Sequence, residues 1–184
     1  MKILFLDLDG VANGHERHAN GYCGTKPECV AQLNRVIAAT DCKLVISSAW
    51  RYLVVNESMT LLGLENLLLT HGLDCKGRVA GLTREDRSLS DKHERGKQVR
   101  EWINSYLSFN LRLDRYAVVD DDDELGIPEA GHPFVKTDGK VGLTEADADK
   151  LIALLGRIER RDVGIAPGQG STPGMGEGRM GDGD

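Results

Sequence analysis

The chain has 184 residues, of which 40% are hydrophobic and 28% are charged, and its formal net charge is −6. This length and composition predict one globular domain with its own core. The negative net charge argues against nonspecific attraction to nucleic acid over the whole surface. No run of eighteen apolar residues occurs, and Asp7 interrupts the short apolar start, so we expect neither a signal peptide nor a membrane span and predict a cytoplasmic protein.

The cysteines stand at positions 23, 29, 42 and 75 and form no CxxC pair. This pattern predicts a reduced chain without disulfides. A zinc site of His15, His18, Cys23 and Cys29 is conceivable, but the Cys-x5-Cys spacing is wider than that of the usual zinc knuckle. A polar loop with scattered Cys and His is the simpler interpretation.

The first part of the chain predicts two strands that flank a helix. Residues 2–9 form a nearly continuous apolar run, which is typical of a parallel strand buried on both faces. Residues 10–26 are rich in Gly, Asn and His and predict a loop. Residues 27–40 begin with a proline and carry apolar residues at helical spacing, which predicts an amphipathic helix. Residues 42–48 predict a second buried strand.

The middle of the chain predicts two more helices and three more strands. A helix over 58–72 ends at a glycine, and a weaker strand follows over 77–83. A helix over 94–107 has apolar residues at helical spacing. Strands over 115–121 and 132–138 follow it.

The last predicted helix lies within 143–159, where Thr144 is a suitable N-cap and acidic residues follow in the first turn. From residue 162 the chain is rich in Gly and Pro and has little to bury, which predicts a disordered tail over 162–184. The order of elements over 1–161 predicts an α/β domain with a mainly parallel sheet.

Polar residues follow several predicted strands, where ligands bind in open parallel sheets. Asp7 and Asp9 end the first strand, and their side chains share one face because residues i and i+2 of a strand do so. Gly10 then lets the chain turn away. Two close carboxylates repel each other unless a proton or a cation lies between them, and Mg²⁺ prefers oxygen ligands. Taken alone, Asp7 and Asp9 could instead be ordinary aspartates of a turn or a helix cap.

A second acidic group, residues 120–123, ends the strand over 115–121. In a parallel sheet both groups lie on one edge, so Asp7 with Asp120 and Asp121 predicts an oxygen-rich magnesium site. Residues 122–124 either support that site or face water. Taken alone, the run is equally typical of an exposed acidic turn.

A hydroxyl and an ammonium complete this group. Ser47 ends the second strand and Lys97 opens a helix, and a phosphoryl group near a magnesium site needs such partners. Arg51 follows the second strand closely and is either a contact for a substrate phosphate or a surface arginine.

The ordered set resembles the haloacid dehalogenase (HAD) superfamily of phosphohydrolases over residues 2–155. Four motifs of this chain carry the resemblance, in this order: Asp7-x-Asp9-Gly10-Val11, a strand ending in Ser47, Lys97, and an apolar strand ending in Asp120-Asp121. The stretches VISSAWR, RGKQVREWI and VVDDDDEL resemble more narrowly the phosphatase domain of multifunctional (Swiss-army-knife) RNA repair proteins.

The resemblance implies a Rossmann-like three-layer sandwich and a role for each matching residue. Asp7 would attack phosphorus and form an aspartyl-phosphate, and Asp9 would protonate the leaving oxygen and then activate water. Ser47, or Ser48 in its place, would bind a phosphoryl oxygen, and Lys97 would stabilise the charge.

The same resemblance implies that Mg²⁺ is held by Asp7, Asp120, Asp121 and the backbone carbonyl of Asp9. The candidates for substrate binding are Gly10, Ser48 and Arg51.

We expect no large cap domain, because the 10–26 loop holds little apolar mass and core elements fill the chain from 48 to 97. An open site would admit a nucleic acid 5′ or 3′ end or a nucleotide. A small metabolite, a phosphoprotein, or a non-catalytic role in binding a metal or a partner are the alternatives. The sequence carries no signal for an oligomeric state.

Segment 76–100 has a net charge of +4 within the acidic chain, from eight basic and four acidic residues. It would steer phosphate-rich substrates if it flanks the site, although a solvated polar loop is the simpler interpretation.

Overall fold

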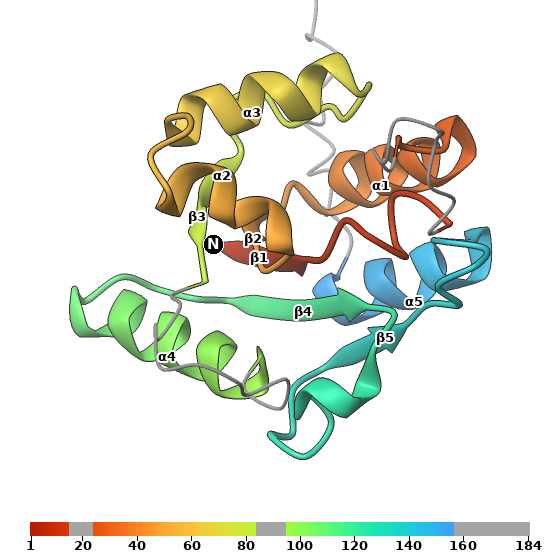
Figure 1. The fold of residues 1–184 in the computed structure, drawn as a ribbon. Helices are drawn as coiled ribbons and strands as arrows, with labels where there is room; N and C mark the ends of the chain where they lie inside the picture. The colour runs from red at the N-terminus through yellow and green to blue at the C-terminus, as the bar shows by residue number, and fades with distance from the viewer. Residues whose placement is uncertain (15–23, 84–94, 157–184) are drawn as a thin grey trace, which may run out of the picture.

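Five parallel strands form one sheet in the order β3-β2-β1-β4-β5 (Figure 1). The structure is a computed structural model, and it describes residues 1–14, 24–83 and 95–156. The strands are β1 (Lys2–Leu6), β2 (Lys43–Ile46), β3 (Val79–Leu82), β4 (Arg115–Asp120) and β5 (Phe134–Lys136). The predicted α/β class with a parallel sheet is therefore confirmed.

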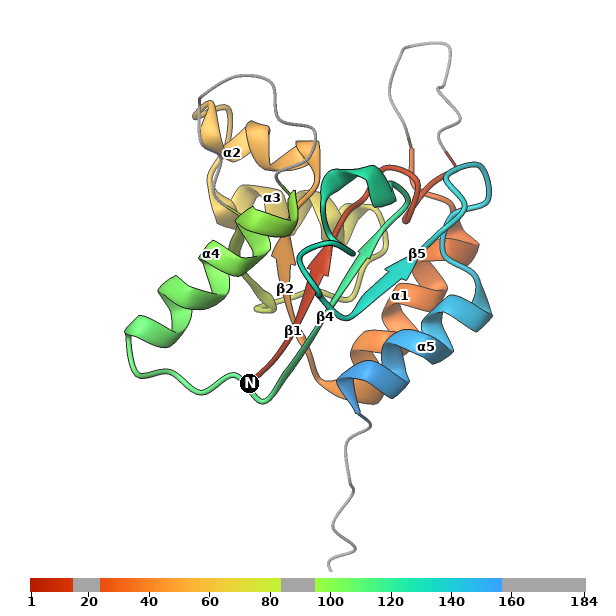
Figure 2. The ribbon, with the colours of Figure 1, turned by 90° about the horizontal axis from the view of Figure 1, so that it is seen from below.

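Helices cover both faces of the sheet. They are α1 (Pro27–Thr40), α2 (Tyr52–Val55), α3 (Leu61–Thr70), α4 (Arg95–Ser108) and α5 (Glu145–Leu155), with short 3₁₀ turns η1 (Ala49–Arg51) and η2 (Asp123–Leu125). Figure 2 shows α4 on one side of the sheet and α1 and α5 on the other. This gives three layers. Within the described residues, no separate cap domain adds to them.

The strands are buried on both faces, which explains their nearly continuous apolar sequences. Leu4 and Leu6 of β1 belong to the larger core cluster, together with residues of α1, α3 and α5. Ile3 and Phe5 of the same strand belong to the second cluster, together with Val99 of α4. Successive side chains of a strand point to opposite faces, and here each face meets its own layer of helices.

The observed elements are shorter than the predicted ones where the chain turns toward the edge of the sheet. β1 ends at Leu6 because the backbone then forms a turn, in which the Ala12 N–H donates to Leu8 O at 2.8 Å. Helix α3 begins at Leu61, where the Thr60 side chain accepts the N–H of Gly63. The predicted cap of α5 is confirmed, because Thr144 and Asp147 form a reciprocal capping box.

Sheet register places a row of polar residues at the carboxyl edge. Backbone pairing continues one residue beyond β1, β2 and β3: Asp7 N donates to Val119 O at 3.1 Å, Ser47 N to Leu6 O at 3.0 Å and Thr83 N to Ile46 O at 3.0 Å. By alternation, Asp7 faces the same side as Phe5, which is the side that α4 covers.

The order of strands also marks where the row is open to a ligand. The chain leaves β1 for β2 and β3 on one side and returns to β4 and β5 on the other, so the order reverses between β1 and β4. Crevices at such reversals are where open α/β sheets bind ligands. Asp7, which follows β1, and Asp120, which ends β4, lie at this point of the sheet.

Two earlier predictions concern residues that the structure does not describe. Of the imagined zinc ligands, His15, His18 and Cys23 lie outside the described residues, and so does the tail over 162–184. Cys29, Cys42 and Cys75 are free, buried thiols. Among the described residues, no helix has the length and apolar character needed to cross a membrane.

Candidate active site

Three carboxylates meet at the carboxyl ends of β1 and β4. One oxygen each from Asp7, Asp120 and Asp121 lies within 4.8 Å of the others. Burial and the nearby Asp120 raise the pKa of Asp7 well above its usual value, and burial also raises the pKa of Asp120. The group therefore needs positive charge to keep its members ionised at neutral pH.

Arg95, the first residue of α4, supplies one positive charge. Its Nη1 lies 3.1 Å from Asp7 Oδ1 and also forms an ion pair with Asp120 Oδ2. Only 16% of the Arg95 side chain is exposed, so this pairing is largely shielded from water. Burial alone would lower the pKa of Arg95, but Asp7 and Asp120 outweigh it and hold the guanidinium charged.

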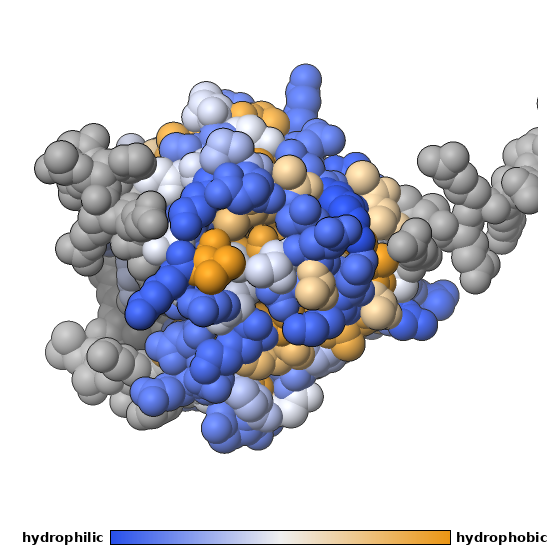
Figure 3. All heavy atoms as spheres, turned by 90° about the vertical axis from the view of Figure 1, so that its right-hand side faces the viewer, coloured by the Kyte–Doolittle hydropathy of each residue, from blue (hydrophilic) through white to orange (hydrophobic). Residues whose placement is uncertain are grey.

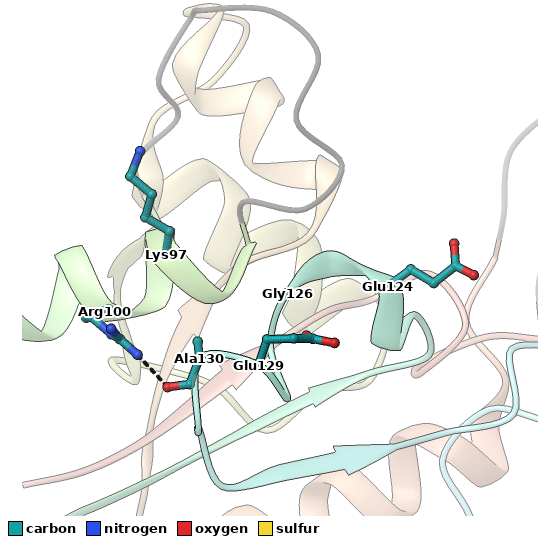
Figure 4. Close-up of a pocket in the computed structure, with 6 residues that line it drawn as sticks. All are labelled: Lys97, Arg100, Glu124, Gly126, Glu129 and Ala130. Carbon is teal, nitrogen blue, oxygen red and sulfur yellow. Dashed lines mark hydrogen bonds between the residues drawn. The ribbon is translucent and has the colours of Figure 1, made fainter.

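Lys97, predicted for this place, lies elsewhere. Figure 4 shows its side chain extending from α4 away from the strands. The residue is exposed and lines a pocket of about 650 Å³. The other lining residues are Arg100, Glu124, Gly126, Glu129 and Ala130. The structure thus brings Arg95, and not Lys97, to the carboxylates.

Helix geometry explains the difference. Residues two apart on an α-helix point about 200° apart, so only one of Arg95 and Lys97 can face the sheet. Arg95 lies one turn before Val99 and two turns before Trp102, which both pack on the sheet. The apolar spacing that predicts the helix thus also indicates that residue 95 faces the strands, a signal that the sequence analysis did not use.

The carboxylate group fits a hard divalent cation. All the side-chain donors are oxygens, and the three negative charges exceed the single charge of Arg95. Gly10 permits this grouping because it has a φ of 77° and because a Cβ atom there would lie 2.4 Å from Cγ of Asp121. The Asp9 carboxylate is not part of the group of three.

Two residues that the sequence analysis missed hold Asp9 in place. Its Oδ1 accepts hydrogen bonds from Asn13 Nδ2 at 3.2 Å and from Trp50 Nε1 at 3.4 Å. Asn13 Oδ1 in turn accepts the N–H of Gly10 at 2.8 Å. These contacts fix the Asp9 carboxylate, whose negative charge is close enough to raise the pKa of Asp7 further.

The acidic run after β4 divides into residues with different tasks. Asp120 Oδ1 accepts the N–H of Asp122 at 3.1 Å, and Asp122 Oδ1 caps η2 by accepting the N–H of Glu124 at 2.9 Å. Asp123 pairs with Lys136 at 2.6 Å, and the bond lowers the pKa of this exposed carboxyl. Only Asp120 and Asp121 contribute to the carboxylate group.

Two buried hydroxyls continue the row on the other side of Asp7. Among the described residues, Ser47 Oγ and Thr83 Oγ1 are buried side-chain oxygens without a hydrogen-bond partner in the structure. Buried polar groups without a partner are rare in folded proteins, so these two hydroxyls are candidates for contact with a ligand. Ser48 differs, because its Oγ caps η1 by accepting the N–H of Trp50 at 3.3 Å. Thr83 was not singled out from the sequence.

Arg51 is 5% exposed, so it is not a surface arginine. Its guanidinium donates to the carbonyl oxygens of Ser47 and Ser48, the latter at 3.1 Å, and to Gln98 Oε1 at 3.5 Å. These bonds fix the turn that follows β2. Its contact with a substrate phosphate stays a prediction.

The face of the molecule toward which β4 points is mainly hydrophilic. The β4 arrow points to the right in Figure 1, and Figure 3 shows the molecule from that side, with small, separated hydrophobic areas among polar residues. Such a face suits a polar or charged ligand more than an apolar one.

Comparison with protein families identifies a relationship for most of the chain. A family model described as the HAD domain in Swiss Army Knife RNA repair proteins matches residues 3–148, which includes every residue of the carboxylate group. No curated protein and no solved structure matches the chain significantly. The resemblance read from the sequence is thereby confirmed.

The two basic residues of α4 provide a matched pair for a stability test. Arg95→Met leaves Asp7 and Asp120 without their guanidinium, and loss of one partner of a buried ion pair costs roughly 3 kcal/mol of unfolding free energy. Lys97→Met changes an exposed residue, and the expected change is within about 0.5 kcal/mol. Urea unfolding of both metal-free variants measures the difference, and equal losses would contradict the assignment of Arg95.

Proposed function

The chain belongs to the family of HAD domains found in Swiss Army Knife RNA repair proteins, and from this membership and the site geometry we propose that it is a phosphomonoester hydrolase. The observation that carries the proposal is the grouping of Asp7, Asp120 and Asp121 with Arg95 at the reversal of strand order. Family membership supports a hydrolase of the phosphatase type, and the carboxylate group supports a divalent metal as cofactor.

We propose Mg²⁺ as this cofactor. The carboxylates of Asp7, Asp120 and Asp121 would hold it, together with the backbone carbonyl of Asp9. When bound, it offsets the charge of the carboxylates and of the phosphoryl oxygens. Arg95 contributes a further positive charge through its ion pairs with Asp7 and Asp120.

In the first proposed step, a carboxylate oxygen of Asp7 attacks phosphorus while the bond from phosphorus to the leaving oxygen breaks. Asp9, held by Asn13 and Trp50, gives its proton to that oxygen. The product is an aspartyl-phosphate on Asp7 and a free alcohol.

In the second step, the Asp9 carboxylate takes a proton from water, and the water oxygen attacks phosphorus. The bond between phosphorus and Asp7 breaks, which releases phosphate, restores the Asp7 carboxylate and leaves Asp9 protonated for the next cycle. Over the two steps, one water molecule is consumed and one phosphate ester is hydrolysed.

The buried hydroxyl of Ser47 is the better candidate for binding a phosphoryl oxygen. It stands next to Asp7 in the row and has no hydrogen-bond partner among the described residues, whereas the Ser48 hydroxyl caps η1. We assign to Arg95, in place of Lys97, the stabilisation of the charge on Asp7 and on the phosphoryl group.

Nucleic acid 5′ or 3′ ends or nucleotides are the proposed substrates. The family description refers to RNA repair proteins, the described residues include no cap domain, and the face toward which β4 points is mainly hydrophilic. Small phosphorylated metabolites and phosphoproteins are the competing classes.

Hydrolysis of p-nitrophenyl phosphate tests the reaction. The wild-type protein is expected to release phosphate with Mg²⁺ and to lose the activity with a chelator. Asp7→Asn removes the nucleophile, and the expected loss is at least about 10³-fold. Wild-type protein that releases no phosphate, or Asp7→Asn that matches wild type, would contradict the proposed hydrolase.

The substrate class is tested with the same assay on 5′- and 3′-phosphorylated oligonucleotides, mononucleotides, phosphosugars and phosphopeptides. Turnover of a phosphosugar with equal inactivity on all nucleic acid ends and nucleotides would overturn the substrate and leave the reaction standing.

The acidic run offers a graded test of the metal site. Asp121→Ala removes a carboxylate of the group of three, and Mg²⁺-dependent turnover is expected to disappear. Asp123→Ala removes only an exposed ion pair with Lys136, so turnover is expected to stay within about threefold of wild type. The activity of both variants is measured over a Mg²⁺ titration, and equal losses would show that the metal carboxylates are placed incorrectly.

A further inference from the structure

The loop between η2 and β5, residues 126–132, contacts the first two turns of α4 at three points. His132 Nε2 lies 2.7 Å from the carbonyl oxygen of Gly96. The Arg100 guanidinium donates to the carbonyl oxygen of Ala130 (Figure 4). A Cβ atom on Gly96 would lie 2.0 Å from the carbonyl oxygen of Gly126, so the two backbones approach as closely as a glycine allows.

The His132 side chain is itself fixed on β4. It is 9% exposed, and its Nδ1 lies 3.1 Å from the hydroxyl of Tyr116. A carbonyl oxygen can only accept, so Nε2 carries the hydrogen that Gly96 O receives, and Nδ1 accepts from Tyr116. Tyr116 packs edge-on against Phe5 of β1, with ring centroids 6.1 Å apart. The imidazole therefore joins the strand that carries Asp120 to the helix that carries Arg95.

Gly96 is the neighbour of Arg95 in the first turn of α4. The guanidinium of Arg95 reaches Asp7 and Asp120, so a shift of this turn would move the charge away from the carboxylates. A misplacement of about 1 Å in an active site can cost about 100-fold in rate, even from a mutation distant from the chemistry.

We propose that His132 is a positioning residue, which acts through the Gly96 carbonyl to hold Arg95 against Asp7 and Asp120. The inference rests on the proposed phosphohydrolase function. His132 does not contact the substrate in this account. Its effect on turnover passes through Arg95, and this distinguishes it from a residue that only fills the core.

The test is a double-mutant cycle with His132→Leu, Arg95→Ala and the combined variant, measured as kcat and KM on p-nitrophenyl phosphate at saturating Mg²⁺. His132→Leu is expected to lower kcat by tenfold or more, with KM changed less than threefold. In the Arg95→Ala background, the same substitution is expected to change kcat by less than twofold, because Arg95 is already gone. Equal losses of kcat in both backgrounds would overturn the proposal.

Two further variants separate positioning from packing. His132→Gln places an N–H donor near the position of Nε2, and it is expected to restore most of the kcat that His132→Leu loses. Ile103→Ala shortens a side chain of α4 that packs in the same core cluster two turns further on, and its kcat is expected to match wild type. A kcat loss in Ile103→Ala as large as in His132→Leu would mean that packing alone explains the effect.

The cycle also gives a result if the proposed reaction is wrong. Wild-type protein without phosphate release would reject the proposed function, and unfolding of the same four proteins in urea would then test the link directly. Non-additive changes in the unfolding equilibrium would support an action of His132 through Arg95. Additive changes would overturn it.

Discussion

The ion pairs of Arg95 with Asp7 and Asp120 are the interaction on which the site depends. They lie where the strand order reverses, and they hold together two buried carboxylates whose pKa values are raised by burial. Without positive charge these groups would take up protons or move apart. The parallel register brings Asp7 and Asp120 side by side, and the first turn of α4 brings the guanidinium to both.

Much of this arrangement could be read from the sequence, because it follows from simple periodicities. Continuous apolar runs marked the strands, and helical spacing marked α1, α4 and α5. Residues at strand ends share one edge in any parallel sheet, so Asp7, Ser47, Asp120 and Asp121 could be placed together before their geometry was known. The apolar spacing of α4 also shows which of its residues face the sheet, and this would have selected Arg95 over Lys97 as the partner of the carboxylates.

Other parts of the site depend on turns, and turn conformations do not follow from periodicity. The hydrogen bonds of Asn13 and Trp50 to Asp9 arise in the turns after β1 and β2. The bond from His132 to Gly96 joins residues 36 apart in the chain, and nothing in the local sequence of either indicates the other. The division of the acidic run into carboxylate group, helix cap and surface ion pair depends in the same way on the turn that forms η2.

The site holds features that cost stability and suit a ligand. The raised pKa of Asp7 means that its ionised form is unfavourable in the protein alone, and the buried hydroxyls of Ser47 and Thr83 have no partner among the described residues. Buried groups whose charge or hydrogen bonds are not satisfied by the protein alone are typical of functional sites. In the proposed function, a cation would offset the charge of the carboxylates and a phosphoryl group would give the Ser47 hydroxyl a partner.

The central claim is that Asp7 carries the phosphoryl group during turnover. Acid quenching of the wild-type protein during hydrolysis of a phosphate ester, followed by mass spectrometry of its peptides, tests this claim most directly. The account predicts a phosphoryl group on Asp7 in the wild-type protein and none in Asp7→Asn. Turnover with the phosphoryl group on another residue, or with no modified peptide in a protein quenched at steady state, would contradict it.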